Sequence, residues 1–335
     1  MTRVYTIYDV AREANVSVAT VSNAINRPAR VGADTRQRVL DVAGRLGYIP
    51  HAAAVYRRSS GRRRIGVIAP FGAYSSYAER LKGVLAALTE DHIEAIVFDH
   101  PSASRSPSPR LAALPFSGRL DGLIIMGVPV DSALSASILE RDLPTILIDS
   151  SHPELSSIVL DDVHGAKLAA EHLVDRGFER FVYVTEGQVS NDYISQGRKR
   201  LTGFVHALGA HGIPESDILC ITARSGDVAG GRAAADVIAG HARRSRVGVL
   251  AGHDLLAAGV LAELRERAVD VPGAVGVVGW DGGELVEALG MTTVHQPLVE
   301  SGRIGAEQLI ARLGAGPASV QRVTLLAELR AGVTT

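Results

Sequence analysis

The stretch that decides the fold of the N-terminal part reads TIYDVA over residues 6–11 and VSVATVSN over residues 16–23. In both segments apolar residues recur at three- and four-residue spacing, which is typical of short amphipathic helices. Asn15 lies between them, where a tight turn is needed. Thr6 and Ser17 stand where N-cap residues begin the two helices. The pattern therefore predicts two short helices joined by a turn.

A third helix is predicted for about residues 35–46, and Gly47 stands where a C-terminal cap needs a positive φ. Three helices in fewer than fifty residues favour a helix-turn-helix unit, whose second helix enters the major groove of DNA. We therefore expect an all-α DNA-binding domain over residues 1–49, followed by a hinge or linker over residues 50–64.

The charge distribution favours the same function. Residues 1–64 hold 12 arginines, no lysine and 4 acidic residues, a net charge of +8, whereas the remaining residues have a net charge of −9. A basic segment is attracted to phosphates and an acidic segment is repelled by them. The total of −1 thus combines a basic head with an acidic body.

Length and composition are those of a globular protein with more than one domain. The chain has 335 residues, of which 46% are hydrophobic, enough for sizeable cores. Its single cysteine, Cys220, excludes an internal disulfide and suits a reducing compartment. The N-terminus shows no signal-peptide core, and no apolar run is long enough to span a membrane. We expect a cytoplasmic protein with no membrane partner.

After Arg64, short apolar segments alternate with amphipathic helical segments, which is typical of parallel sheets covered on both faces. The expected strands are residues 65–69, 95–98, 122–126, 145–149, 181–184, 218–221, 247–251 and 275–279. They form two sets, which predict two doubly wound α/β lobes with a ligand cleft at the carboxyl ends of the strands. We place the core at residues 65–335, with lobe one at about 65–161 and 294–322, and lobe two at about 162–293 and 323–335.

Several motifs resemble those of the lac repressor (LacI/GalR) family of bacterial transcription regulators. The head motif is close to diagnostic, with IYDVA at residues 7–11 and VSVATVS at residues 16–22. The core adds DGLII at 121–125, AEHL at 170–173, RLTGF at 200–204, VVGWD at 277–281 and TTVHQP at 292–297. The resemblance covers residues 5–333. It implies a head, a hinge and a periplasmic-binding-protein-like core that act as a homodimer on a near-palindromic DNA operator.

The resemblance also implies which residues contact DNA. Val18, Ala19 and Asn23 take the positions that face base edges, where Asn23 can pair bidentately with adenine and the other two can contact only a thymine methyl group. A second group is implied to hold the phosphate backbone without reading sequence. Its members are Thr6, Tyr8, Ser17, Thr20, Ser22, Asn26 and Tyr48. For Thr6 and Ser17, helix capping alone is the alternative.

The hinge departs from the family pattern. His51, Ala54 and Arg57 take its minor-groove positions, and Arg57 stands where the family has a leucine that wedges between bases. A leucine wedge kinks the duplex, whereas an arginine favours a narrow, electronegative groove. We therefore expect DNA binding without the leucine wedge.

Six core residues match positions where the family contacts its small-molecule effector. They are Tyr77, Asp149, Arg200, His253, Asp281 and Gln296, with His253 replacing the usual asparagine. Carboxylates, an arginine and an amide beside an aromatic ring suit a hydroxyl-rich molecule, because each hydroxyl both donates and accepts. A sugar is therefore the expected effector. Asp281 could instead only cap a helix, and His253 could support the site without contacting the ligand.

Metal and catalytic chemistry are not expected. Asp161, Asp162 and His164 are metal-ligating residue types, but they match the segment where the family's chain crosses between lobes. No phosphate-binding loop with lysine, zinc-ligand spacing or nucleophile elbow occurs in the sequence. The prediction is a repressor, not an enzyme, that uses no cofactor or metal. Two alternatives stay open: a DNA-binding regulator with no effector, and a sugar-binding receptor, which would need a signal peptide and would not use a basic head.

Overall fold

The computed structural model describes residues 7–26, 30–46, 63–102, 106, 111, 120–190, 193–313 and 319–335. The chain forms two compact units, Met1–Arg62, called the head, and Arg63–Thr335, called the core. Some predicted DNA contacts lie outside the described residues: Thr6, Tyr48, His51, Ala54, Arg57 and the side chain of Asn26. Within the described ranges, no helix has both the length and the hydrophobicity needed to cross a membrane.

The head consists of three helices, α1 (Ile7–Glu13), α2 (Val18–Asn26) and α3 (Ala33–Leu46). Asn15 makes the turn between α1 and α2 with a φ of 51°, a left-handed conformation that asparagine tolerates. Ser17 caps α2, because its Oγ accepts from the backbone N–H of Thr20 at 3.0 Å. The three helices share a small apolar core made of Val10, Ala11, Ala14, Val21, Ala24, Val39, Val42 and Ala43. The predicted helix-turn-helix fold is confirmed.

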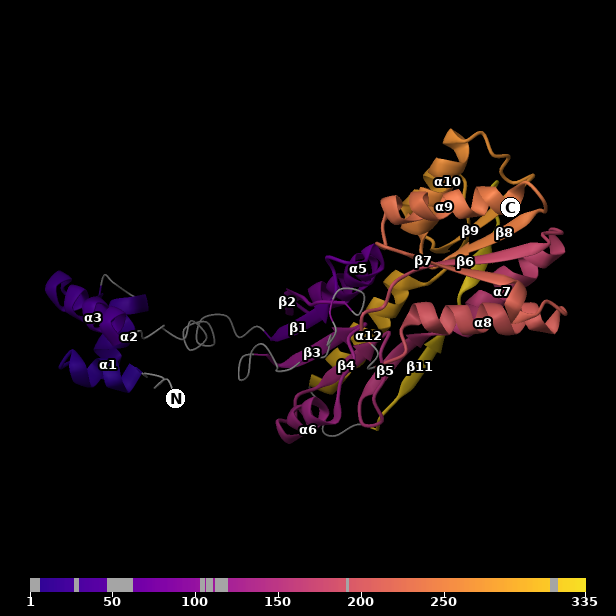
Figure 1. Cartoon of the computed structure of the whole chain (residues 1–335). Coiled ribbons are helices and arrows are strands. Elements are labelled where there is room, and N and C mark those ends of the chain that lie inside the picture. Colours follow the sequence, from indigo (N-terminus) through magenta and orange to yellow (C-terminus); the bar gives the residue numbers. More distant parts are fainter. Residues whose placement is uncertain are drawn as a thin grey trace. The chain divides into compact units, whose positions relative to one another are not determined.

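The core has two lobes, each built on a six-stranded sheet (Figure 1). The sheet of lobe one has the order β11-β5-β4-β3-β1-β2 and is parallel throughout. Its elements are β1 (Arg64–Ala69), α5 (Ser75–Glu90), β2 (Glu94–Asp99), β3 (Gly122–Met126), α6 (Ser132–Glu140), β4 (Thr145–Ile148), β5 (Ser156–Leu160), α12 (Leu298–Leu313) and β11 (Arg322–Leu325).

The sheet of lobe two has the order β12-β10-β9-β8-β6-β7. Its elements are α7 (Asp162–Asp175), β6 (Arg180–Glu186), α8 (Gln196–Ala210), the 3-10 helix η2 (Glu215–Asp217), β7 (Ile218–Ala223), α9 (Val228–Ala242), β8 (Val247–Ala251), α10 (Asp254–Glu266), β9 (Val275–Asp281), α11 (Glu284–Leu289), β10 (Thr292–His295) and β12 (Glu328–Arg330). This sheet is parallel, as the strand pattern predicts, except that the edge strand β12 runs antiparallel to β10.

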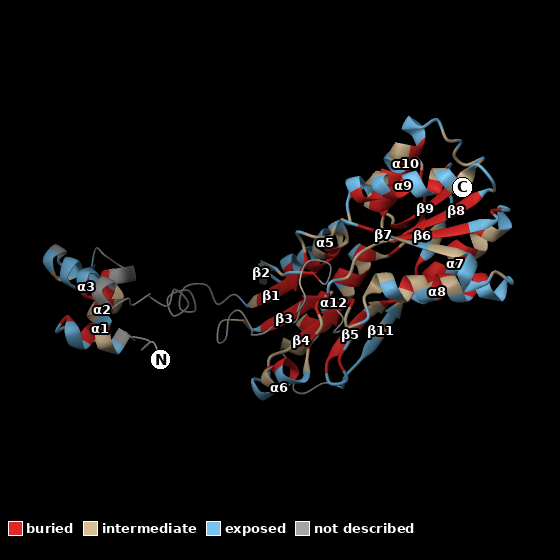
Figure 2. Ribbon diagram, in the orientation of Figure 1, coloured by how far each residue is buried: buried red, intermediate tan, exposed pale blue. Residues whose placement is uncertain are grey.

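The central strands of both sheets are buried on both faces, because helices cover each face. In lobe one, Ile65 and Val67 pack toward α5 and α12, while Ile68 belongs to a separate cluster with residues of α6. In lobe two, one cluster joins the sheet to α9 and α10 and a second joins it to α7 and α8, on the opposite faces that Figure 1 shows. Figure 2 shows that buried residues run along the central strands of both sheets.

The chain crosses between the lobes three times. The crossings follow β5, β10 and β11, because β10 belongs to the sheet of lobe two and β11 to the sheet of lobe one. The predicted boundaries are therefore wrong by a few residues: residues 294–295 lie in lobe two and residues 323–325 in lobe one. The second and third crossings lie at residues 296–297 and 326–327.

Candidate functional site

A cavity lies between the two lobes, at the carboxyl ends of strands from both sheets. Six of its lining residues end or directly follow β1, β3, β4, β6, β8 and β9: Pro70, Gly127, Asp149, Glu186, Gly252 and Asp281. Its volume is about 90 Å³. In doubly wound sheets this edge is where ligands bind, so the cleft that the strand pattern predicts is present.

Five of the six predicted effector contacts line this cavity: Tyr77, Asp149, Arg200, His253 and Asp281. The sixth, Gln296, does not line it and is only 2% exposed. Its amide lies among Arg80, Arg200, Trp280 and Asp281, so it connects buried polar groups behind the cavity. Gln296 lies behind the cavity because it directly follows β10, where the chain crosses between the lobes.

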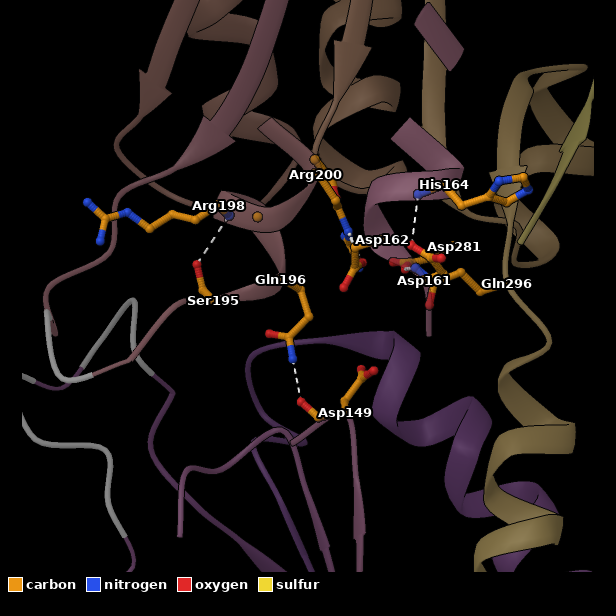
Figure 3. Close-up of polar contacts among 12 residues, drawn as sticks. Asp149, Asp161, Asp162, His164, Ser195, Gln196, Arg198, Arg200, Asp281 and Gln296 are labelled. Atoms are coloured by element: carbon orange, nitrogen blue, oxygen red, sulfur yellow. Dashed lines mark hydrogen bonds and ion pairs between the residues drawn. The ribbon is translucent and has the colours of Figure 1, made fainter. Parts of the chain in front are cut away.

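Arg200 is held by three different contacts. It lies on the buried face of α8, which Ser195 caps. Its Nε donates to Asp162 Oδ1 at 2.8 Å, and its Nη1 donates to the carbonyl oxygen of Gly252 at 2.6 Å. The guanidinium lies 4.4 Å from the ring centroid of Trp280. Figure 3 shows Arg200 directed toward Asp162, whereas the nearby Arg198 is turned away.

A second buried arginine, Arg80, was missed by the sequence analysis. Its Nη2 lies 2.5 Å from Asp149 Oδ2, and its side chain is 1% exposed. Asp149 follows β4 with a φ of 58°, a left-handed conformation that aspartate tolerates. Arg80 lies on the amphipathic helix α5, where an arginine normally indicates a solvent-facing position. The partner is 69 residues away, so no local pattern marks the pair.

Side chains of the described residues also join the lobes directly across the cavity. Gln196 of lobe two donates from Nε2 to the carbonyl oxygen of Asp149 in lobe one at 2.5 Å (Figure 3). Tyr74 of lobe one donates its hydroxyl to the carboxylate of Glu186 in lobe two. Neither Gln196 nor Glu186 was predicted, although Glu186 ends β6 and the carboxyl-end rule could have identified it.

His253 and Asp281 lie at the ends of neighbouring strands of lobe two. Burial lowers the pKa of His253 to about 4, so its imidazole is neutral at pH 7. Asp281 has a φ of 116°, a strained conformation for a residue other than glycine. Asp254 stabilises the turn that follows, because its Oδ2 accepts from the N–H of Gly282 at 2.7 Å. Asp281 is not a helix cap, since Gly283 is the N-cap residue of α11.

The pKa of Asp281 predicts a pH-dependent stability. Burial raises it from 3.8 to about 7, with Arg200 acting in the opposite direction and Asp254 adding to the increase. Between about pH 4 and pH 7 the folded state therefore retains a proton that the unfolded state releases, and this contribution destabilises the fold as pH rises. We expect Asp281→Asn to raise the melting temperature more at pH 8 than at pH 5.

Thermal melts of the parent and the variant at both pH values measure this difference. Asp175→Asn, at an exposed carboxyl of α7, is the control and should change neither melt. An equal gain at both pH values would show that Asp281 keeps its ordinary acidity in the fold.

The described part of the head presents several of the predicted DNA contacts. Tyr8 is 71% exposed and Ala19 is exposed. The hydroxyls of Ser17 and Thr20 lie 2.8 Å apart on an exposed surface. Ser22 and Asn23 are half-buried. Val18 is also half-buried and packs against the apolar core of the head, so only part of its side chain is available to a base.

The residues of metal-ligating type near the first crossing have other roles. Asp161 caps α7, because its Oδ1 accepts from the N–H of His164 at 2.9 Å, and Asp162 pairs with Arg200. Figure 3 shows the His164 ring turned away from both aspartates. Among the described residues, no group of three or more histidine, cysteine, aspartate or glutamate side chains is placed to hold a metal ion.

Comparison with known proteins gives matches over both units. Residues 6–51 match the model of bacterial regulatory proteins of the lacI family, and residues 170–335 match that of a periplasmic binding protein-like domain. The HTH-type transcriptional regulator DegA of Bacillus subtilis (strain 168) is 29% identical over 309 residues, which cover 89% of this chain and 88% of that protein.

Solved structures share the fold. The transcriptional regulator CelR–cellobiose complex has a TM-score of 0.66 at 24% identity, covering 99% of this chain and 100% of that chain. The lac repressor dimer bound to operator and the anti-inducer ONPF has a TM-score of 0.68 at 22% identity, covering 99% of each chain. With a lacI-type head, a periplasmic-binding-protein-like core and a relative that is a transcriptional regulator, this chain belongs to the LacI/GalR family of transcriptional regulators.

Proposed function

We propose that the chain is a sequence-specific DNA-binding repressor whose operator affinity is changed by a sugar effector. The observation that carries this proposal is the presence, in one chain, of a helix-turn-helix head and a core with a polar cavity between two lobes. A ligand that binds one arrangement of the lobes more tightly shifts the population toward it. Coupling to DNA binding then follows if the two arrangements differ in operator affinity.

The chemistry of the cavity supports a sugar. Its lining offers hydroxyls, side-chain amides and carboxylates beside tyrosine rings, which together suit a molecule with many hydroxyl groups. The similar CelR structure is a complex with cellobiose, and the similar lac repressor structure is a dimer on its operator. We extend sugar binding, the dimer and operator binding to this chain, and propose a homodimer on a near-palindromic operator. We further propose that it acts in the cytoplasm and has no catalytic activity.

In this proposal α2 reads the operator. Val18, Ala19 and Asn23 contact base edges, and a second set of described residues holds phosphates: Tyr8, Ser17, Thr20 and Ser22. Helix α2 contains no aspartate or glutamate, so no carboxylate on it would repel the phosphates.

Asn23→Ala tests this assignment. Loss of a bidentate contact to adenine should cost about 1–3 kcal/mol of binding free energy in each half-site and relax the preference at one base pair. Selection from a randomised operator library, before and after the substitution, measures that preference. Asp41→Ala on α3 is the control, because Asp41 was not predicted to contact DNA. Uniformly weaker binding with an unchanged base preference would assign Asn23 to the backbone instead.

The effector part is tested with the same operator. A sugar that binds the cavity should change operator affinity, measured by fluorescence anisotropy, by a factor that corresponds to about 1–3 kcal/mol. Operator binding that no sugar changes would leave a DNA-binding regulator without a sugar effector.

A further inference from the structure

The arginines at the cavity are already committed to partners within the protein. Anionic ligands are normally recognised by arginine N–H groups that are free to form a fork with a phosphate or carboxylate. Arg200 has one N–H bonded to Asp162 and another to the Gly252 carbonyl, and its plane lies over Trp280. The amide of Gln296 lies beside its remaining nitrogen. Arg200 is therefore neutralised and has little capacity left for an anion.

The same holds for Arg80 in the opposite lobe. Its Nη2 is bonded to Asp149, and its Nη1 lies 3.3 Å from the carbonyl oxygen of Ser76. With a side-chain exposure of 1%, it is not itself part of the cavity lining. Each lobe thus brings a buried arginine together with a buried aspartate, and each pair has no net charge.

No other cation is available among the described residues that line the cavity. Arg200 is the only arginine there, no lysine is present, and His253 is neutral. Among the described lining residues, a phosphate or carboxylate would therefore find no unpaired counter-charge to offset the loss of its hydration, which is strongly unfavourable.

Asp281, unlike the paired arginines, is a charged group of the cavity without an ion-pair partner among the described residues. The amide of Gln296 lies 3.4 Å from its Oδ1, but the amide orientation that accepts from Arg200 and Trp280 turns an oxygen toward Asp281 and donates nothing to it. The charges that act on it come from Arg200, Asp254, Arg80 and Asp149. A buried carboxylate in this situation gains from a ligand group that donates a hydrogen bond to it.

We propose that the cavity selects a ligand that has no anionic group and donates a hydrogen bond to Asp281, and that it rejects phosphorylated or carboxylated forms of the same molecule. This inference rests on the proposed sugar-binding function and narrows its ligand class. A sugar hydroxyl and an ammonium group both supply the donor. The ammonium additionally supplies a positive charge to the carboxylate.

Matched sets of sugars test the proposal on the full chain. One set is glucose, glucosamine, glucose 6-phosphate and glucuronic acid, and a second is the corresponding galactose series. At pH 8, where Asp281 with its pKa of about 7 is mostly ionised, thermal shift finds the sets that bind and isothermal titration gives the dissociation constants. Within a binding set we expect the phosphorylated and acidic members to bind about 100-fold more weakly than the neutral sugar, or worse, because like charges then meet in a buried site.

The Asp281→Asn variant distinguishes the hydroxyl donor of a neutral sugar from the ammonium donor of an amino sugar. The amide keeps the shape of the side chain but removes its charge, so any advantage of the amino sugar over the neutral sugar should disappear. Glu179→Gln, at an exposed carboxyl outside the cavity, is the control and should leave all dissociation constants unchanged.

The outcomes distinguish this inference from the proposed function. A phosphorylated or acidic sugar that binds as tightly as its neutral parent overturns the charge selectivity while leaving a small-molecule effector in place. An amino-sugar advantage that survives Asp281→Asn overturns the role of Asp281. If no member of any set binds or changes operator affinity, the sugar function itself is wrong and the inference falls with it.

Discussion

Replacing Arg200 with alanine is expected to lower the free energy of unfolding of the core by about 3–5 kcal/mol, the usual range when one partner of a buried ion pair is removed. The reason is the group left behind. Asp162 has a side-chain exposure of 3%, and its only ion pair among the described residues is with Arg200. Burial already raises the pKa of Asp162, and Arg200 is the main group that opposes this shift. Without Arg200, the carboxylate must either stay charged without a partner or take up a proton.

Urea unfolding at pH 7 measures this loss. Arg198→Ala is the matched control, because Arg198 is exposed, lies on the same helix and is turned away from the cavity (Figure 3). Its change should stay within about 0.5 kcal/mol. Adding Asp162→Asn to Arg200→Ala should recover part of the stability, since the neutral amide is cheaper to bury than the unpaired carboxylate. A single variant as stable as the parent would mean that water reaches Asp162.

Replacing Gly302 with alanine should destabilise the core by about 1–3 kcal/mol or more, the range for overpacked interiors. Gly302 lies where α12 meets α5, and an added Cβ would lie 1.9 Å from the carbonyl oxygen of Arg80. Gly83 on α5 makes the reciprocal approach, with an added Cβ 1.9 Å from the carbonyl oxygen of Val299. Backbone atoms cannot rotate away as side chains do, so the two helices must separate.

Gly240→Ala provides a control with the opposite sign. Gly240 lies in α9, and an added Cβ would meet nothing within 4 Å. Alanine is favoured over glycine inside a helix by up to about 1 kcal/mol, so this variant should gain stability. Urea unfolding of both variants measures whether the free energy of unfolding falls for Gly302→Ala and rises for Gly240→Ala. A gain for Gly302→Ala as well would contradict the close contact between α5 and α12.

The strands and their order along the chain could be predicted because burial on both faces leaves a local signal. Ile65–Ala69 and Gly122–Met126 are continuous apolar segments, and their length of five residues favours a buried strand over a buried helix. The lobe to which β10 and β11 belong could not be predicted in the same way. Which sheet a strand joins depends on its pairing partner, and β11 pairs with β5, more than 160 residues earlier.

The site was predictable where it follows from strand ends and not where it follows from packing. Asp149 and Asp281 stand at the carboxyl ends of apolar segments, so the sequence places them at the cleft. The position of Gln296 behind the cavity and the pairing of Arg80 with Asp149 depend on how the two lobes meet. Neither the position of Gln296 nor the Arg80–Asp149 pair produces a recognisable pattern in the neighbouring sequence. The charge selectivity of the cavity follows from these pairings, so the sequence alone could not give it.

The three crossings between the lobes also decide what kind of movement the core can make. A single linker would let one lobe rotate in any direction relative to the other. The three connections lie close together, because β5 pairs with β11 and β10 pairs with β12. Together they resist twisting and sliding of one lobe against the other. Hinge bending of the two lobes about these crossings is the motion that remains. Any molecule that draws the lobes together therefore drives them along one path, whichever corner of the cavity it contacts. The response is set by how far the lobes close and not by which side chain the ligand touches first.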